Sequence, residues 1–375
     1  MANPKTKWDI FNSAHILQQK RFVWLDYDKG ISIILVALGH SYFVLTEHGV
    51  DLSAYPAINY ISTFLWGFRM PLFFIISGSL IARGLQKKGL ATYVFNRTNN
   101  ILYPLIVWGL AQIILNFLSA RDAAAALHNI FNLFIDPRQL GPIWYLNALF
   151  FIGLIYAVLK AKLNLSPVAQ IVLGMMFFAV AGYIQMHDIN AGMLTDVFEF
   201  YIFFALGDLI SNFFFNEAHI KRFTSWGIFL PLLALFLAVQ YVCVGYNINN
   251  SIDGINFVQH KLPWLYLFEA LVGCAMSISL SFLLQKHRWL PFLRVVGYHS
   301  LFIYCMQIIT MNFARIGLIS ILKVTNVPVL FISVWIIGLV VPMLAYNLFM
   351  KLNMWWLFTF KKPHQPTVDL KVVGG

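Results

Sequence analysis

The sequence predicts an all-α protein, a polytopic membrane helix bundle of about ten transmembrane helices. Of its 375 residues, 60% are hydrophobic and only 11% are charged, whereas soluble domains carry about 25% charged residues. A soluble fold of this size could not bury so much apolar surface, so lipid must surround most of the chain. This composition excludes a soluble enzyme, a secreted disulfide scaffold and a disordered chain.

Ten apolar runs make up the predicted bundle, and a single crossing requires about 20 residues. The runs are hydrophobic on all sides, as expected of helices surrounded by lipid and by other helices. We therefore predict a cytoplasmic N-terminal segment 1–28, a membrane domain 29–350 and a cytoplasmic tail 351–375. The runs lie at 29–47, 57–82, 101–120, 142–160, 166–186, 197–215, 223–244, 263–285, 296–320 and 328–350.

Basic residues predict how the bundle is oriented. Of the 26 Lys and Arg residues, 20 lie in segments at one end of the predicted helices and four at the other end. Because cytoplasmic loops are rich in Lys and Arg, both termini are expected in the cytoplasm. An anionic leaflet beside these loops accounts for the net charge of +11, so membrane lipid rather than nucleic acid is the predicted partner. The three cysteines have no metal-ligand spacing, and no metal is predicted.

The first run carries the most informative polar residues. His40 follows Lys29 by 11 residues, and Glu47 follows His40 by seven. Both spacings return to within about 20° of the same helix face, and Lys29 and His40 are about 16 Å apart along the axis. Ionisable groups inside a membrane are expensive and usually functional, which favours a functional role for His40 over a packing role. Lys29 could instead be a snorkelling anchor, and Glu47 a solvated helix end.

Arg69 lies in the middle of the second run, where its charge needs a carboxylate, a ring of carbonyls or water. Two interpretations are equally compatible with this position. One is a structural ion pair with Glu199, Asp208 or Glu269. The other is a direct contact with a substrate.

Basic and aromatic residues gather near the ends of the runs. A basic patch follows the second run, and topology explains most of it, but it would also suit a polyphosphate ligand. The aromatic pair that opens the fourth run is typical of an interfacial belt. The basic residues are Arg83, Lys87, Lys88 and Arg97, the aromatic pair is Trp144 and Tyr145, and the ninth run carries His299, Ser300, Tyr304 and Gln307.

Several of these motifs resemble acyltransferase family 3, a family of integral-membrane acyltransferases. The strongest match is a basic residue, ten further residues and then a histidine, here Lys29 and His40. The segment PLFFIISG, Pro71–Gly78, matches the PLFF-x-x-SG element of the family. The matches run in order from about residue 24 to residue 307. The weaker ones are Arg97 with Pro104, Trp144–Leu146 and Gly297–Tyr304.

Three positions depart from the pattern of the family. Lys29 stands where many members have Arg, and this form resembles the fucose 4-O-acetylase-like branch. Asn100 stands where the third motif usually carries a second basic residue. Gln307 stands near the place of a late histidine, which argues against a second histidine role but leaves His40 unaffected.

The resemblance implies O-acyl transfer in a bacterial inner membrane, from acetyl-CoA as acyl donor to the hydroxyl of a carbohydrate or lipid-linked glycan. It implies that His40 acts as general base or carries the acyl group covalently, with Glu47 and Arg69 as further catalytic residues. Arg69, or donors near Ser77 and Gly78, would stabilise the oxyanion. The residues expected at acyl-CoA are Lys29, Lys87, Lys88, Arg97, Ser77 and Gly78, and those expected at the acceptor are Trp144, Tyr145 and Tyr304.

A proton-coupled secondary transporter is the main alternative, because buried His40, Glu47 and Arg69 would also suit a carrier. Against it, the sequence shows neither an internal repeat nor a matching pair of broken helices in two halves. A glycan-export component is a third interpretation, which the small size of the bundle disfavours.

Overall fold

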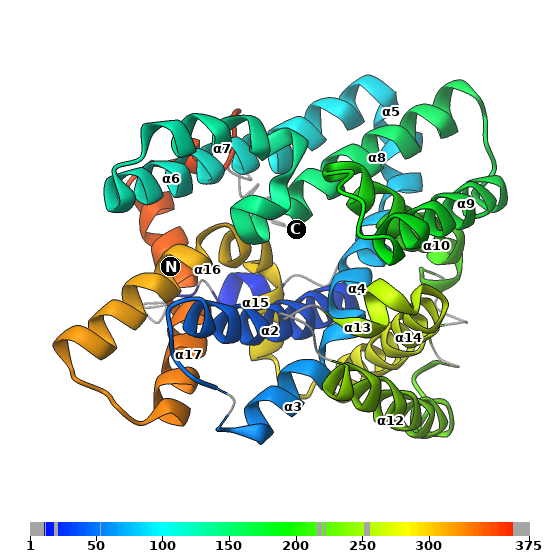
Figure 1. Ribbon diagram of the computed structural model, residues 1–375. Coiled ribbons are helices and arrows are strands. Elements are labelled where there is room, and N and C mark those ends of the chain that lie inside the picture. Colours follow the sequence, from blue (N-terminus) through cyan, green and yellow to red (C-terminus); the bar gives the residue numbers. More distant parts are fainter. Residues whose placement is uncertain are drawn as a thin grey trace, which may run out of the picture.

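The computed structural model describes residues 11, 13–18, 22–52, 54–215, 220, 223–250 and 256–362. Within these residues every regular element is a helix (Figure 1). The predicted all-α class is therefore confirmed. Parts of the predicted segments 1–28 and 351–375 lie outside the described residues.

Among the described residues, nine helical stretches are long and apolar enough to cross a membrane. Each coincides with one of the ten predicted runs, which confirms a polytopic bundle. The remaining predicted run, 197–215, lies on α10 (Met193–Phe214). This helix has 22 residues and three acidic side chains, and it is not among the nine stretches. The nine stretches are Val23–Thr46, Pro56–Leu85, Gly89–Ala120, Pro137–Lys162, Pro167–Met186, Trp226–Asn249, Pro263–His287, Ser300–Ile321 and Val327–Lys351.

Several stretches contain more than one helix, because the chain bends within them. The longer helices are α2 (Val23–Thr46), α4 (Trp66–Ser79), α5 (Ile81–Arg97), α6 (Tyr103–Ala120), α8 (Trp144–Lys162), α9 (Pro167–Met186), α12 (Trp226–Asn249), α14 (Pro263–His287), α16 (Ser300–Ile316) and α17 (Val327–Lys351). The shorter ones are α1 (Ser13–Gln18), α3 (Pro56–Phe64), η2 (Thr98–Leu102), α7 (Ala123–Ile135), η3 (Pro137–Ile143), α13 (Phe257–Lys261), α15 (Phe292–Tyr298), η4 (Gly317–Ile321) and η5 (Trp355–Leu357).

Helix α2 occupies the middle of the bundle and packs against α4, α14, α15, α16 and α17 (Figure 1). Glycines allow its closest crossing, since a methyl group at Gly30 would collide with the carbonyl of Leu293 in α15, and one at Gly297 with the carbonyl of Asp26. Small residues of this kind let helix backbones approach each other in membranes. The crossing fixes the N-terminal half of α2 against α15.

Helix α10 packs against α4, α8 and α9 on the other side of the bundle. Its crossing with α4 also depends on glycine, because a methyl group at Gly78 would collide with the carbonyl of Phe204. Asp208 accepts a hydrogen bond from the Tyr156 hydroxyl at 2.6 Å and pairs with Lys160 of α8. Buried charges are tolerated when they are paired in this way.

Candidate functional site

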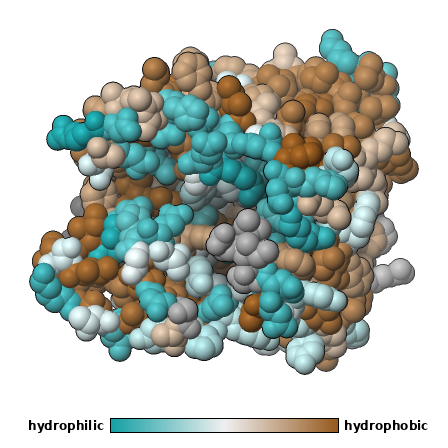
Figure 2. All heavy atoms as spheres, in the orientation of Figure 1, coloured by the Kyte–Doolittle hydropathy of each residue, from teal (hydrophilic) through white to brown (hydrophobic). Residues whose placement is uncertain are grey.

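A cavity of about 700 Å³ lies at one end of the bundle, beside α2. Figure 2 shows hydrophilic residues gathered around a hollow on the face that Figure 1 presents. The cavity is lined near the C-terminal ends of α2, α6 and α16 and near the N-terminal ends of α4 and α8. With the predicted orientation, this end faces away from the cytoplasm. Lining residues from these ends include Glu47, Ser119, Arg315, Arg69 and Trp144.

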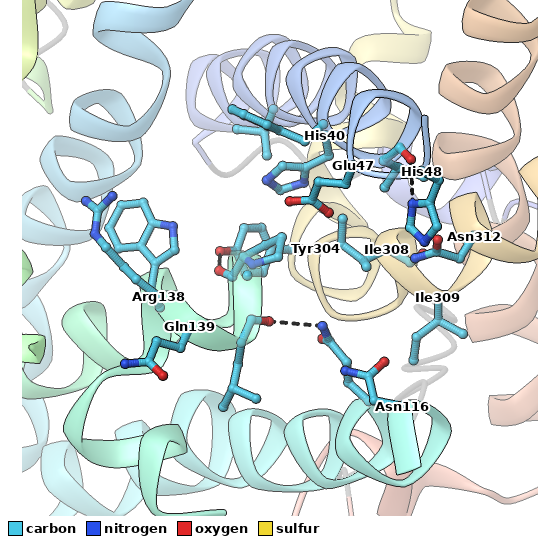
Figure 3. Close-up of a pocket in the computed structure, with 18 of the residues that line it drawn as sticks. His40, Glu47, His48, Asn116, Arg138, Gln139, Tyr304, Ile308, Ile309 and Asn312 are labelled. Carbon is cyan, nitrogen blue, oxygen red and sulfur yellow. Dashed lines mark hydrogen bonds between the residues drawn. The ribbon is translucent and has the colours of Figure 1, made fainter. Parts of the chain in front are cut away.

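His40 points from α2 into this cavity, as does Glu47 two turns later (Figure 3). The imidazole is half-buried, and its ring centroid lies 6.2 Å from that of Tyr304 on α16. Within the described residues, Nδ1 of His40 is buried without a hydrogen-bond partner. Gln307 interacts with His40 and is fully buried, and neither of its amide atoms forms a hydrogen bond of good geometry within the described residues. These atoms have unused hydrogen-bonding capacity that a ligand can satisfy.

Arg69 lies beside His40 because Gly39 has no side chain. A methyl group at Gly39 would collide with the Arg69 guanidinium, whose Nη1 donates to the Leu35 carbonyl at 3.3 Å. The guanidinium also lies over the Trp66 ring, 4.2 Å from its centroid, a cation–π contact. The chain thus places a fixed positive charge next to the imidazole.

No carboxylate within the described residues forms an ion pair with Arg69. Glu199 interacts with Arg138, Asp208 with Lys160, and Glu269 accepts from Gln240 at 3.1 Å. The structural ion pair that the sequence left open is therefore not formed. Arg69 is 4% exposed and lines the cavity, so its charge faces the space where a substrate would lie.

A hydrogen-bonded wall continues from Trp66 across the cavity. The indole Nε1 donates to Gln259 at 3.0 Å, and Gln259 donates to Glu199 at 2.7 Å. Arg138 interacts with the same carboxylate at 4.0 Å and pairs with Asp196 at 2.6 Å. These contacts join α4, α10, α13 and η3 around the cavity.

The predicted acceptor residues occupy different places. Tyr304 lines the cavity (Figure 3), and its hydroxyl donates to the Pro142 carbonyl. Trp144 lines it too, but its ring packs against Arg138, at 4.5 Å, and Phe200, at 5.3 Å. Tyr145 is buried behind Tyr304, with ring centroids 5.1 Å apart, and is not among the lining residues.

The rim of the cavity carries polar residues at the ends of α2 and α16. Glu47 and His48 are exposed, and the His48 ring hydrogen-bonds the Val44 carbonyl at 2.8 Å (Figure 3). Asn312 and Arg315 line the cavity from α16. Nε of Arg315 is buried without a hydrogen-bond partner in the described part of the chain.

None of the predicted acyl-CoA residues whose side chains the structure describes lines the cavity. Lys29 lies on α2 about 16 Å from His40 along the axis, and it is half-buried near Asp26. Arg97 is buried and donates to the Leu149 and Phe150 carbonyls and to the Tyr93 hydroxyl at 2.9 Å. These bonds join α5 to α8, and binding of acyl-CoA by Arg97 stays a prediction.

The remaining donor candidates lie elsewhere. Ser77 and Gly78 belong to the part of α4 that contacts α10. Lys87 is exposed on α5, and the side chain of Lys88 lies outside the described part. Binding of acyl-CoA by these residues and by Lys29 stays a prediction.

Sequence reasoning missed Gln259 and gave Arg138 no role at the site. Gln259 lies on α13, a helix of five residues in a loop, and such a helix has no periodic pattern to reveal it. The acidic residues Asp196 and Glu199 offered a signal for these polar partners. They are three residues apart at the start of one predicted membrane helix, where acidic side chains require partners.

Short contacts outside the membrane spans hold α13 in place. Lys261 forms an ion pair with Asp188 at 2.8 Å, and this hydrogen bond holds the pKa of the Asp188 carboxyl below its usual range. Burial lowers the pKa of His260, so its neutral form is favoured beside the cavity wall. The Asn256 side chain caps α13 by accepting from Gln259 N at 3.0 Å.

Comparisons with known proteins agree with this architecture. Residues 22–347 match acyltransferase family 3, whose model is described as an acyltransferase domain. Nodulation protein NolL of Mesorhizobium japonicum is 35% identical over 83 residues, which is 22% of this chain and 21% of that protein. No solved structure gives a significant match. Since the family match extends over most of the chain, this integral membrane protein belongs to acyltransferase family 3.

Proposed function

We propose that this protein is an O-acyltransferase that moves an acetyl group from acyl-CoA to a hydroxyl of a carbohydrate or lipid-linked glycan. The observation that carries the proposal is the imidazole of His40 in a cavity, next to Arg69, which forms no ion pair with a carboxylate in the described part of the chain. A base and a fixed cation side by side are what acyl transfer to a hydroxyl requires. We further propose a bacterial inner membrane and, on the Lys29–Gly30 form of the motif, a relation to sugar O-acetylases.

The proposed chemistry uses His40 as a general base. A ring nitrogen of His40 takes the proton of the acceptor hydroxyl while the hydroxyl oxygen attacks the thioester carbonyl. The new C–O bond forms, the C–S bond breaks, and the leaving CoA sulfur takes the proton back from the imidazolium. The charge of Arg69 stabilises the oxyanion that develops between these steps.

We assign the cavity to the acceptor and the opposite end of α2 to the donor. The cavity reaches His40 from the Glu47 end, and polar side chains such as Asn116, Asn312 and Gln139 line it, as sugar binding requires. The donor is assigned to the end of Lys29, whose charge suits the phosphates of CoA. His40 lies between the two.

The test is acyl-CoA turnover by purified protein with envelope glycan extracts as acceptors. We expect release of CoA thiol that depends on the acceptor, and an acceptor that gains the mass of one acetyl group. The carrier alternative predicts solute-dependent proton uptake into proteoliposomes and no thiol release with any extract. That second result would reject the proposed enzyme.

A further inference from the structure

Gln259 joins the cavity wall to the pair formed by Trp66 and Arg69. Its Oε1 accepts from the Trp66 indole at 3.0 Å, and its Nε2 donates to Glu199 at 2.7 Å. We infer that Gln259 is a positioning residue, which fixes the Trp66 ring and, through it, the Arg69 guanidinium beside His40. The inference rests on the proposed function of His40 and Arg69 and adds a residue to it.

The position of Arg69 depends on few contacts. Helix α2 contacts the Arg69 guanidinium at Gly39 and at the Leu35 carbonyl. The Trp66 ring supplies another contact, at 4.2 Å from its centroid. The bond to Leu35 is long, at 3.3 Å, and therefore weak. A rotation of the Trp66 ring would release the guanidinium toward the cavity and away from His40.

Trp66 determines which end of the Gln259 amide faces Glu199. An indole only donates a hydrogen bond, and a carboxyl oxygen of Glu199 can accept one. The amide must therefore direct its NH₂ group to Glu199 and its oxygen to Trp66. Glu199 is itself held, because its other oxygen accepts from Gln185 at 2.8 Å and lies 4.0 Å from Arg138. The direction of each bond thus fixes the next one.

The backbone of Gln259 is fixed as well. Asn256 caps its N–H group at 3.0 Å, and the Asn247 side chain accepts from Val258 N at 2.8 Å. Lys261 ties the end of α13 to Asp188. The Gln259 side chain is 5% exposed and lines the cavity. A side chain held so firmly at the edge of a reaction space is suited to orient its neighbours.

Gln185 provides a matched control for the Gln259 experiment. Both glutamines are almost fully buried, and each donates one hydrogen bond to Glu199. Of the two, Gln259 is the one that bonds Trp66. Replacing either by Leu removes one donor from the same carboxylate, so damage to Glu199 alone would be similar in both variants.

The experiment compares Gln259→Leu, Gln185→Leu and Trp66→Phe, alone and combined, in the purified full-length protein with acetyl-CoA and the active acceptor extract. Displacement of a catalytic group by about 1 Å lowers turnover by up to about 100-fold. For Gln259→Leu we expect kcat to fall by about 10- to 100-fold, with KM for acetyl-CoA within about 2-fold. Gln185→Leu should lower kcat by less than about 3-fold, because the bond that Gln185 donates goes to Glu199 and not to Trp66, which contacts Arg69.

Two further comparisons test the inference, and the second keeps it falsifiable if Gln259→Leu is poorly folded. Trp66→Phe keeps an aromatic ring, smaller than the indole, and removes the N–H group, so Gln259→Leu should add little in the double variant. The exchange Glu199→Gln with Gln259→Glu gives position 259 a carboxylate that accepts from both Trp66 and the new amide at position 199. This exchange should restore kcat above that of Gln259→Glu alone, in which two carboxylates repel each other.

Equal losses of kcat in Gln259→Leu and Gln185→Leu, additive effects with Trp66→Phe, or no rescue by the exchange would overturn the inference. These results differ from failure of the proposed function. In that case the unmodified protein would release no thiol with any acceptor, or His40→Ala would remain fully active.

Discussion

The two ends of helix α2 are built differently although they belong to one continuous helix. At the Lys29 end, Gly30 lies against the backbone of α15, and the neighbouring Asp28 accepts from Ser277 at 2.7 Å and from Ser281 at 3.0 Å. At the His40 end, Gly39 lies against a side chain, and polar atoms face a cavity. The Lys29 end is closely packed against neighbouring helices, and the His40 end faces a cavity.

This difference bears on the proposal that one helix serves two substrates. The cavity at the proposed acceptor end is already formed in the described structure, but it does not extend to Lys29. Donor entry at the Lys29 end would therefore require movement of the helices around α2. Since packed helix interfaces change between discrete arrangements rather than gradually, the donor end is expected to open as a unit.

The largest effect is expected from His40→Ala, which removes the proposed base from the open end. Loss of a general base lowers turnover by about 100- to 10,000-fold, and we expect kcat to fall within this range. Thiol release from acetyl-CoA in the presence of acceptor measures it. His128→Ala, at an exposed position on α7, serves as control and should retain activity. Near-normal turnover in His40→Ala would contradict the assignment.

Gly39→Ala tests the open end without replacing a catalytic side chain. The added methyl group meets the end of the flexible Arg69 side chain, which can move aside, so the protein should fold. We expect kcat to fall by about 100-fold, near the effect of losing an oxyanion donor, with little change in the melting temperature. Gly245→Ala on α12, which meets no atom within 4 Å, is the control. A large loss of thermal stability would argue against this account.

Gly30→Ala is the counterpart at the packed end and should give the opposite result. Its methyl group meets the backbone carbonyl of Leu293, which cannot move without separating α2 from α15. Overpacking of this kind lowers the free energy of unfolding by about 1–3 kcal/mol. A lower melting temperature in detergent, measured beside Gly245→Ala, would confirm the prediction. The comparison between the two ends fails if Gly30→Ala is as stable as Gly39→Ala.

The smallest effect is expected from Lys29→Met, which removes the charge proposed to bind the CoA phosphates. One hydrogen bond to a charged group contributes about 1.5–3 kcal/mol, so KM for acetyl-CoA should rise by about 10-fold or more while KM for the acceptor stays constant. Lys29→Arg should keep the affinity, and Lys162→Met, at an exposed position, provides the control. An unchanged KM in Lys29→Met would leave Lys29 as a membrane anchor.

Composition and periodicity were sufficient to predict most of the fold. The apolar runs identify their helices because lipid requires about 20 apolar residues for each crossing. The placement of His40 and Glu47 on one side of the first helix was also readable from their spacing, and both line the cavity. The predicted orientation of the termini and the acyl-CoA residues stay predictions.

The rest of the site could not be predicted because it depends on contacts between distant segments. Gln259 and Glu199 are 60 residues apart and meet only when α13 packs against α14 and α9 near the start of α10. Arg69 was recognised as a buried charge, but its neighbours Gly39 and Trp66 follow from how α2 and α4 cross. No spacing rule within one helix contains that information.

The space that Gly39 leaves for Arg69 has a consequence for natural variation. Two positions that share one volume cannot be changed independently, so substitutions at 39 and 69 should be correlated among relatives. A relative with a side chain at the position of Gly39 should carry a residue smaller than arginine at the position of Arg69. Such a relative would have to stabilise its oxyanion from another helix, and its sequence would indicate which one.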